Sequence, residues 1–179
     1  GDQTIAGLTS CGATFTGFNL VGNPYPSYMS WYGASATNVG TTIWYKSKNT
    51  GSYVFQTYNS AGGGATNGGT NLIPPMQAFW IKVTSGSGSI VFDVNDRSHN
   101  DQSVSTNRLK SPAEDTRKIL RLEVSNGINK DEALIYADVN AQNSYDTYDS
   151  NKMFNNNAAV PVSYTVLGAE KLAIYGFNN

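Results

Sequence analysis

Oxygen-bearing side chains recur between positions 138 and 149 with a spacing that could hold a calcium ion. Asp138 and Asn140 take the first and third positions of a calcium-loop pattern, Asp146 lies further along it, and Asp149 takes its last position. Calcium prefers such hard oxygen ligands. However, an asparagine replaces the sharp-turn glycine, and Asp149 replaces the bidentate glutamate. We therefore favour an Asx-rich surface turn with Asp149 paired to Lys152, and keep Ca²⁺ as the alternative; no other cofactor is indicated.

The rest of the chain contains few of the residues that catalytic sites need. A nucleophilic serine or cysteine needs a base, usually histidine, and the only histidine is His99 in a polar connection. The single Cys11 excludes an internal disulfide framework and a cysteine-based zinc site. Glycoside hydrolysis needs only two carboxylates, but no Asp or Glu occurs from Gln3 to Phe92, where the best sugar-stacking residues lie. We predict that the chain is not an enzyme.

Four aromatic residues in that acid-free part could stack on sugar rings, namely Trp44, Tyr45, Tyr58 and Trp80. They are the ligand-binding residues expected of a carbohydrate-binding module, provided that two or more rings lie exposed on one face. Aromatic residues are also normal strand formers, so core and cross-strand packing is the simpler interpretation of each ring. Trp80 alternates with the apolar residues Phe79, Ile81 and Val83 along its strand, so its ring is expected to point outward.

The elements that must position these side chains are short strands throughout the chain. Apolar residues alternate with polar ones, and clusters of Gly, Asn and Ser separate the runs. The glycines at 62–64 and 68–69 are expected to mark a flexible surface loop. We predict hairpins that pair residues 43–46 with 53–58, 79–83 with 90–94, 120–124 with 133–137, and 162–166 with 172–177, and a further strand at 15–21.

Composition agrees with an all-β protein. Charged residues make up 14% of the chain, against about 25% in an average soluble domain. Asn, Gly, Ser and Thr are abundant instead, which is typical of turns and of hydroxyl-bearing strand faces. We predict an all-β fold, specifically a jelly-roll-like β-sandwich of about nine strands.

The charges divide the chain into two halves. Residues 1–94 are aromatic-rich and nearly uncharged, residues 95–116 form a polar connection, and residues 117–179 are charged. In the last part, Leu120, Leu122 and Val124 offer an apolar face that a short four-stranded unit could hardly cover alone. We therefore expect the two halves to pack together as one body.

The overall charge limits the classes of partner. Twelve Lys and Arg residues against thirteen Asp and Glu leave a net charge of −1, which cannot neutralise a run of phosphates. No stretch approaches the roughly 18 to 20 apolar residues of a membrane span. Neither nucleic acid nor direct membrane insertion is expected.

Two proline-rich corners have predicted structural roles. Pro24 and Pro26 fix their own backbone and hold Asn23 extended, so the chain must leave its strand there. Pro74 and Pro75 do the same just before the strand at 79–83. These corners should hold the adjacent loops in place.

Trp31 follows the first corner and is the largest apolar group available to hold the connection to the next strand. Because prolines remove backbone donors, side chains must replace a ladder at this point. We predict that Trp31 is a buried anchor whose indole N–H finds an acceptor, and not a sugar platform.

The runs Asn-Pro-Tyr-Pro-Ser at 23–27 and Pro-Pro-Met-Gln-Ala-Phe-Trp at 74–80 carry a family resemblance. With weaker matches at 97–99, 120–122, 131–133 and 145–153, the chain resembles a β-rich region recurring in large secreted and surface proteins of Bacteroidetes bacteria. That region usually precedes a C-terminal sorting domain read by the type IX secretion system. The resemblance implies an extracellular or outer cell-surface location and assigns no catalytic residues.

Two functions are consistent with these features. The first is a non-catalytic secreted or cell-surface structural or adhesive module, whose partners are other domains of a longer surface protein or an extracellular protein. The alternative is a carbohydrate-binding module that stacks exposed aromatic rings on an extracellular glycan. The exposure of the aromatic rings separates the two.

Overall fold

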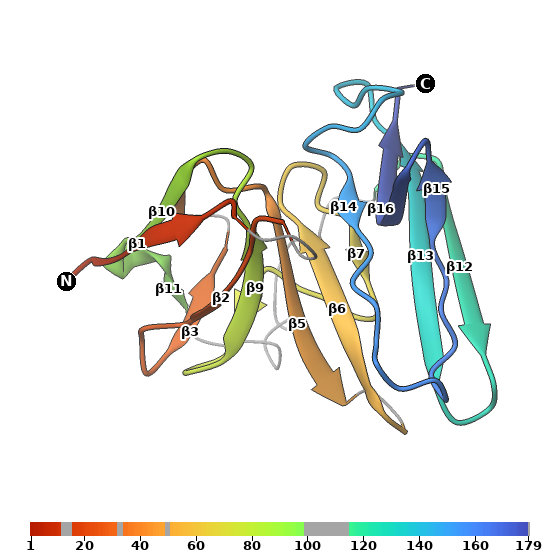
Figure 1. The fold of residues 1–179 in the computed structure, drawn as a ribbon, viewed down its shortest axis with the longest axis horizontal. Helices are drawn as coiled ribbons and strands as arrows, with labels where there is room; N and C mark the ends of the chain where they lie inside the picture. The colour runs from red at the N-terminus through yellow and green to blue at the C-terminus, as the bar shows by residue number, and fades with distance from the viewer. Residues whose placement is uncertain (12–15, 32–33, 49–50, 99–114, 179) are drawn as a thin grey trace, which may run out of the picture.

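The computed structural model describes residues 1–11, 16–31, 34–48, 51–98 and 115–178, and these residues form an all-β fold (Figure 1). The predicted β-sandwich class is confirmed, but the described residues contain sixteen strands. Most of the unexpected strands are two or three residues long, too short for an alternating pattern to reveal them. The strands are β1 (Gln3–Thr9), β2 (Phe18–Gly22), β3 (Tyr28–Ser30), β4 (Ser35–Thr37), β5 (Thr42–Lys48), β6 (Tyr53–Asn59), β7 (Ala65–Thr66), β8 (Leu72–Ile73), β9 (Ala78–Lys82), β10 (Ser87–Phe92), β11 (Arg97–Ser98), β12 (Ile119–Ser125), β13 (Lys130–Ala137), β14 (Ser150–Asn151), β15 (Thr165–Leu167) and β16 (Glu170–Phe177).

The first half of the structure, residues 1–98, is built from three sheets. A five-stranded sheet has the order β2-β9-β5-β6-β7, and two three-stranded sheets have the orders β1-β10-β4 and β11-β3-β8. Alternate residues of the large sheet point toward the small sheets, where they form one buried apolar cluster. The cluster includes Leu8, Met29, Trp31, Ile43, Tyr45, Ile73, Phe79, Ile81, Ile90 and Phe92.

The predicted hairpin of residues 79–83 with 90–94 is wrong, although both segments contain strands. β9 pairs with β2 and β5, whereas β10 pairs with β1 and β4 in another sheet. Val83 instead bridges to Val39, and a side chain at Gly88 would press against the Val83 methyl groups. The chain therefore crosses from one layer to the other, and the alternating apolar residues of both strands meet in the core from opposite sides.

The predicted connection 95–116 is partly structured. Residues Val94–Asp96 form a 3₁₀ turn that begins at Asp93, whose carboxylate accepts from the Asn95 amide at 2.7 Å. β11 follows at once and pairs with β3. Residues 99–114 of the connection, with His99 and Pro112, lie outside the described residues.

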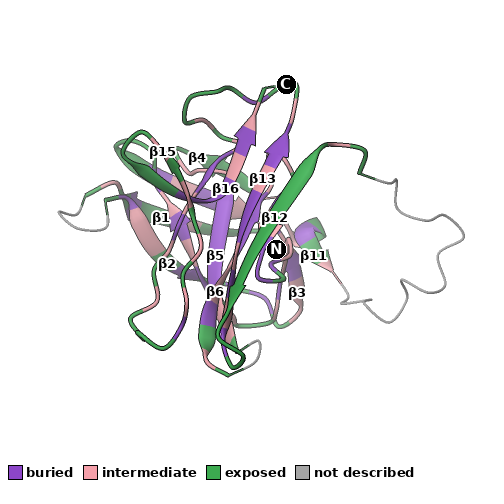
Figure 2. Ribbon diagram, turned by 90° about the vertical axis from the view of Figure 1, so that its right-hand side faces the viewer, coloured by how far each residue is buried: buried purple, intermediate pink, exposed green. Residues whose placement is uncertain are grey.

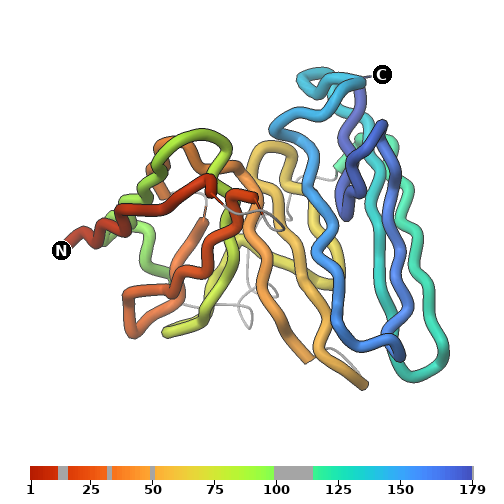
Figure 3. Tube along the Cα trace, in the orientation of Figure 1, coloured from red at the N-terminus to blue at the C-terminus, as the bar shows by residue number. Residues whose placement is uncertain are grey.

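The second half, residues 115–178, is one sheet with the order β12-β13-β16-β14, and β15 also pairs with β16. The predicted β12–β13 hairpin is confirmed, as is the β5–β6 hairpin of the first half. The predicted hairpin of residues 162–166 with 172–177 exists in a shorter form, because only Thr165–Leu167 pairs with Glu170–Leu172, while the rest of β16 pairs with β13 and β14. Gly127 and Gly168 take positive φ angles of 87° and 60° in the two turns of this half. The first half and the second half lie side by side, with β7 facing the second sheet (Figure 3).

The glycines at 62–64 do not mark a free surface loop, because they pack against the second sheet. A side chain at Gly62 would overlap the Tyr136 hydroxyl, and one at Gly64 would press on Ile174 and Leu134. Leu134, Tyr136, Ala173 and Ile174 make the apolar cluster of the second half. The glycines therefore let the first half approach this cluster closely.

Hydrogen bonds of buried side chains also join the halves. The Asn59 amide nitrogen donates to the carbonyls of Thr147 at 3.0 Å and Asp149 at 3.1 Å, and the Thr42 and Ser150 hydroxyls lie 2.9 Å apart. The Asn67 amide nitrogen donates to the Asp131 carboxylate at 2.8 Å. That the halves unfold together stays a prediction.

Candidate interaction surface

Three of the four candidate sugar-stacking residues are buried. Trp44, Tyr45 and Tyr58 are 2%, 7% and 5% exposed. Tyr45 and Tyr58 point into the first core, whereas Trp44 lies on the opposite face of the sheet under the second half and donates its indole N–H to the Asn151 carbonyl at 2.9 Å. These three rings cannot stack on a sugar.

Trp80 is half-buried and does not form a flat platform. Its ring meets Phe55 edge-to-face, with centroids 5.5 Å apart and an interplanar angle of 72°. It shares a sheet face with Trp44, its partner in β5. The four aromatic residues are therefore not brought together as an exposed site.

The predicted structural residues have the expected environment at the first corner. Asn23 is buried, and its amide nitrogen lies 2.9 Å from the Ser27 carbonyl, 3.1 Å from that of Ile73 and 2.9 Å from that of Pro74. Its side-chain oxygen accepts from the Tyr25 amide at 2.9 Å. The Asn23 side chain thus links the segment after β2 to the second corner, at Pro74 and Pro75. The rings of Pro24, Pro26 and Pro75 are exposed to solvent.

The predicted calcium ligands are engaged with protein donors. Asp138 accepts from the Asn140 amide at 3.0 Å and from Arg117 at 3.1 Å. Asp146 accepts from the Gln142 amide at 2.7 Å and from that of Tyr148 at 2.8 Å. Among the described residues, no three His, Cys, Asp or Glu side chains gather as a metal site requires.

Asp149 is a buried capping residue and does not pair with Lys152, which corrects the predicted ion pair. Its carboxylate accepts from the Asp146 amide at 2.9 Å and the Gly176 amide at 3.0 Å. Burial raises the pKa of Asp149 to about 6, against the opposing effect of these two hydrogen bonds. The oxygen-rich segment is therefore a set of Asx turns that closes on β16.

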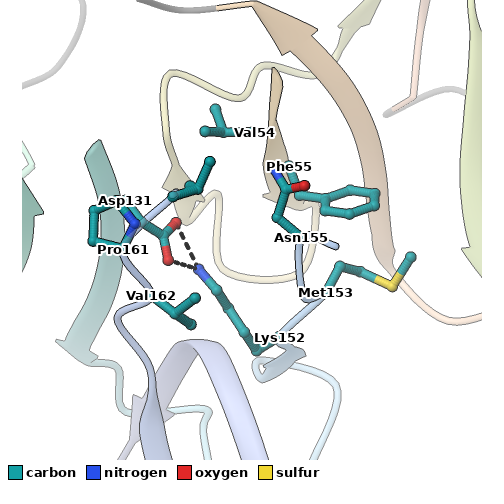
Figure 4. A pocket seen from close by; sticks show the side chains of 9 residues that line it. Val54, Phe55, Asp131, Lys152, Met153, Asn155, Pro161 and Val162 are labelled. Atoms are coloured by element: carbon teal, nitrogen blue, oxygen red, sulfur yellow. Dashed lines mark hydrogen bonds and ion pairs between the residues drawn. The ribbon is translucent and has the colours of Figure 1, made fainter. Parts of the chain in front are cut away.

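Lys152 pairs instead with Asp131, at the junction between the halves (Figure 4). The ammonium lies 2.6 Å and 2.7 Å from the two carboxylate oxygens, and both side chains are almost fully buried. Asp131 also accepts from the Ser163 amide at 2.8 Å. The adjoining pocket has room for only about 10 Å³, roughly one water molecule, so no larger ligand fits beside the pair.

A larger groove of about 280 Å³ lies where the halves meet above Trp44. Lys82 and Tyr145 line it, and each is bound to the Asn151 side-chain oxygen at 2.8 Å. Burial raises the pKa of Tyr145 to about 12. The two carboxylates that line the groove, those of Asp146 and Asp149, accept from backbone amides.

An exposed apolar surface lies on the second sheet, on the side away from the first half. Leu134, Tyr136 and Ile174 face the first half, so alternate residues of the same strands face outward. On β12, Leu120, Leu122 and Val124 are 52%, 46% and 37% exposed. We call the side of the sheet that carries them the outer face; its other apolar members include Ile135, Phe154, Tyr164, Val166, Tyr175 and Phe177.

The outer face contradicts the prediction that the Leu120, Leu122 and Val124 face packs on the first half. β12 is exposed along its whole length (Figure 2). Its inward residues Arg121 and Glu123 are charged, and Arg121 reaches the Ala65 carbonyl of the first half at 2.8 Å. The charged face is therefore the one turned inward, and the apolar face is left to solvent.

The outer face also carries four aromatic rings and one lysine, Lys171. The Lys171 ammonium lies 5.4 Å from the Phe154 ring centre and 5.3 Å from that of Tyr164. Tyr175 and Phe177 are half-buried, and their rings lie near-parallel, at 30°, with centroids 6.1 Å apart. The sequence could have indicated this surface, since Val162, Tyr164 and Val166 alternate as clearly as the residues of β12.

None of the described segments forms a helix with the length and apolar character that a membrane crossing needs. Comparison of the chain with protein-family models, curated proteins and solved structures finds no match in any of the three.

Proposed function

We propose that this chain is a non-catalytic structural or adhesive module of a secreted or cell-surface protein, and that it docks through the outer face of its second sheet. The single observation that carries the proposal is the exposure of the apolar strip Leu120, Leu122 and Val124 together with Val166, which is 61% exposed. Soluble monomers rarely leave contiguous apolar patches of this kind uncovered unless something binds there.

The partner that best fits the outer face is another β-rich domain of the same surface protein or of a neighbouring extracellular protein. The strip Leu120, Leu122 and Val124 leaves part of this sheet face uncovered, and a second β layer would bury it. The resemblance to surface proteins of Bacteroidetes agrees with such a setting and supports an extracellular or outer cell-surface location.

Carbohydrate binding remains the second candidate, and a specific pair of rings favours it. The half-buried rings of Tyr175 and Phe177 lie near-parallel, which is the arrangement that a sugar-stacking platform needs. This pair would be the sugar-binding surface of the alternative, since the rings of Trp44, Tyr45 and Tyr58 are buried. Binding of a glycan that is lost when Tyr175 is replaced would favour the carbohydrate-binding function over the structural one.

The proposal is tested by binding of the labelled chain to cells of the organism that produces it. Val166→Lys places a charge in the outer face at a side chain that has no polar partner to lose, and we expect it to reduce binding about tenfold or more. Met76→Lys is the matched control, because Met76 is an exposed apolar residue of the first half, 85% exposed. Equal binding by wild type and both variants would overturn the proposal.

A further inference from the structure

The β12 strand has one edge that pairs with no other strand of the described residues. It pairs with β13 on one side only, and it ends the order of its sheet. All seven of its residues are exposed. Natural edge strands are usually blunted by proline, a bulge or inward-pointing charges. β12 has no proline and its register with β13 is uninterrupted, and its two inward charges, Arg121 and Glu123, have opposite signs, so they disfavour a non-complementary strand more than a second copy of β12. It is therefore suited to accept another strand.

The sequence of β12 is complementary to itself when it runs antiparallel about its central residue. With Leu122 opposite Leu122 of a second copy, Arg121 lies opposite Glu123 and Leu120 lies opposite Val124, each twice by symmetry. Opposite charges in directly facing positions stabilise an antiparallel pair, and apolar pairs do the same. Both Arg121 and Glu123 have exposed side chains, 50% and 52%, that remain available beyond their ion pairs within the chain.

Neighbouring registers are worse than this one. Centring the pair on Arg121 or on Glu123 would place two like charges directly opposite each other, which is destabilising. A shift by one residue would set charged positions against apolar ones and break the common outer face. Electrostatics and apolar matching therefore select the same register, with the two-fold axis at Leu122.

We propose that two copies of this chain associate through antiparallel pairing of their β12 strands, centred on Leu122. The two second sheets become one continuous sheet, and the strips Leu120, Leu122 and Val124 of both copies form one apolar band. This inference deepens the proposed function and rests on it, since it names a second copy as one partner of the second sheet. The contact is small, so we expect a reversible dimer with a dissociation constant in the range of about 1 μM to 1 mM.

Sedimentation equilibrium of the whole chain tests the association, against a monomer mass of 19.2 kDa. Arg121→Glu leaves two acidic positions on the edge and Glu123→Arg leaves two basic ones, so each variant alone should self-associate about tenfold or more weakly. An equimolar mixture of the two should associate at least as well as wild type. A mass that stays monomeric up to about 1 mM would overturn the proposal.

A cysteine test fixes the register and does not depend on the ion pairs within the chain. In a Cys11→Ser background, Leu122→Cys should form a disulfide-linked dimer on mild oxidation, because facing residues lie about 4.5 to 5.5 Å apart at their Cα atoms. Val124→Cys alone should not, since the two sites would lie roughly 14 Å apart along the strands. Mixed with Leu120→Cys, it should crosslink. Equal self-crosslinking at 120, 122 and 124 would overturn the register.

Failure of this inference and failure of the proposed function are distinguishable. Val166→Lys lies off β12 and should leave self-association unchanged while it weakens binding to cells. A chain that stays monomeric but binds cells in a Val166-dependent way would refute only the dimer. A chain that dimerises but binds cells equally with or without Val166→Lys would refute only the proposed function.

Discussion

The indole N–H of Trp31 donates to the Thr41 carbonyl at 2.9 Å and so bridges the segment after β3 to the start of β5. The ring is 4% exposed and meets Phe79 edge-to-face, with centroids 6.0 Å apart. Trp31 therefore combines apolar packing with a satisfied polar group in a stretch that lacks a continuous ladder.

Replacing Trp31 by Ala should lower the free energy of unfolding by about 3 to 5 kcal/mol, as other buried large-to-small changes do. The cavity and the lost N–H bond at Thr41 both contribute. Urea unfolding followed by circular dichroism measures the change. A variant that melts like the parent but no longer binds a glycan array would reassign Trp31 as a ligand contact.

Replacing Asn23 by Ala should cost about 2 to 3 kcal/mol, because it leaves a buried amide and several carbonyls without partners. Asn19→Ala is the matched control, since the Asn19 amide also donates to two carbonyls, those of Thr9 and Gly17, but at a more exposed place. We expect it to cost about 1 kcal/mol. An equal decrease in the free energy of unfolding in the two variants would show that the buried hydrogen bonds of Asn23 stabilise the fold no more than those of Asn19.

The buried pair of Lys152 and Asp131 should respond asymmetrically to substitution. Burial lowers the pKa of Lys152, and the neighbouring Asp131 opposes that shift. Lys152→Met leaves a buried carboxylate without its cation and should cost about 3 to 5 kcal/mol. The double variant Asp131→Asn/Lys152→Met should recover part of this loss, because the amide oxygen still accepts from Asn67 or Ser163.

Thermal and urea unfolding of wild type, Asp131→Asn, Lys152→Met and the double variant measures this coupling. Lys130→Met is the control, because Lys130 pairs with Glu123 at an exposed position and should change stability little. A double variant as unstable as the sum of the two single changes would contradict the account of the junction.

Stability should depend on pH through Asp149, whose pKa rises from the ordinary 3.8 to about 6 by burial. The folded chain then holds this proton more tightly than the unfolded chain does. The contribution is fully present below the unfolded pKa and is lost as pH rises to about 6, by at most about 3 kcal/mol.

Comparison with Asp149→Asn isolates this group, because the variant cannot titrate there. Urea unfolding at intervals from acidic to neutral pH should show the extra decline in wild type only. The variant should also be less stable at neutral pH, because the Asp146 and Gly176 amides donate to different carboxylate oxygens and the amide nitrogen that replaces one oxygen in Asn cannot accept. Parallel pH profiles for the two proteins would contradict the raised pKa.

Local patterns predicted local structure well and long-range placement poorly. The β5–β6 hairpin follows from the turn residues between its strands, which are visible within a few positions. The pairing of β9 and β10 with distant strands is not visible in that way, because alternation reports which side is buried and not against what. Asn23 and Trp31 were accessible to sequence reasoning because prolines removed the backbone alternatives.

For the candidate surface too, local features could be predicted from the sequence and long-range contacts could not. Trp44 is covered by residues more than a hundred positions away, so its own neighbourhood could not show that it is buried. Leu120, Leu122 and Val124 were recognised as an apolar face, but only the placement of Arg121 toward Ala65 determines that this face points away from the first half.

Photo-crosslinking from position 166 tests the central claim most directly. A photoreactive amino acid replaces Val166 in the protein as its producing cells display it, and the same probe at Met76 serves as the control. We predict that irradiation links position 166 to another domain, to a neighbouring extracellular protein or to a second copy, identified by mass spectrometry, and links position 76 to none. Equal yields from the two positions, or no product from position 166, would contradict an outer face that docks.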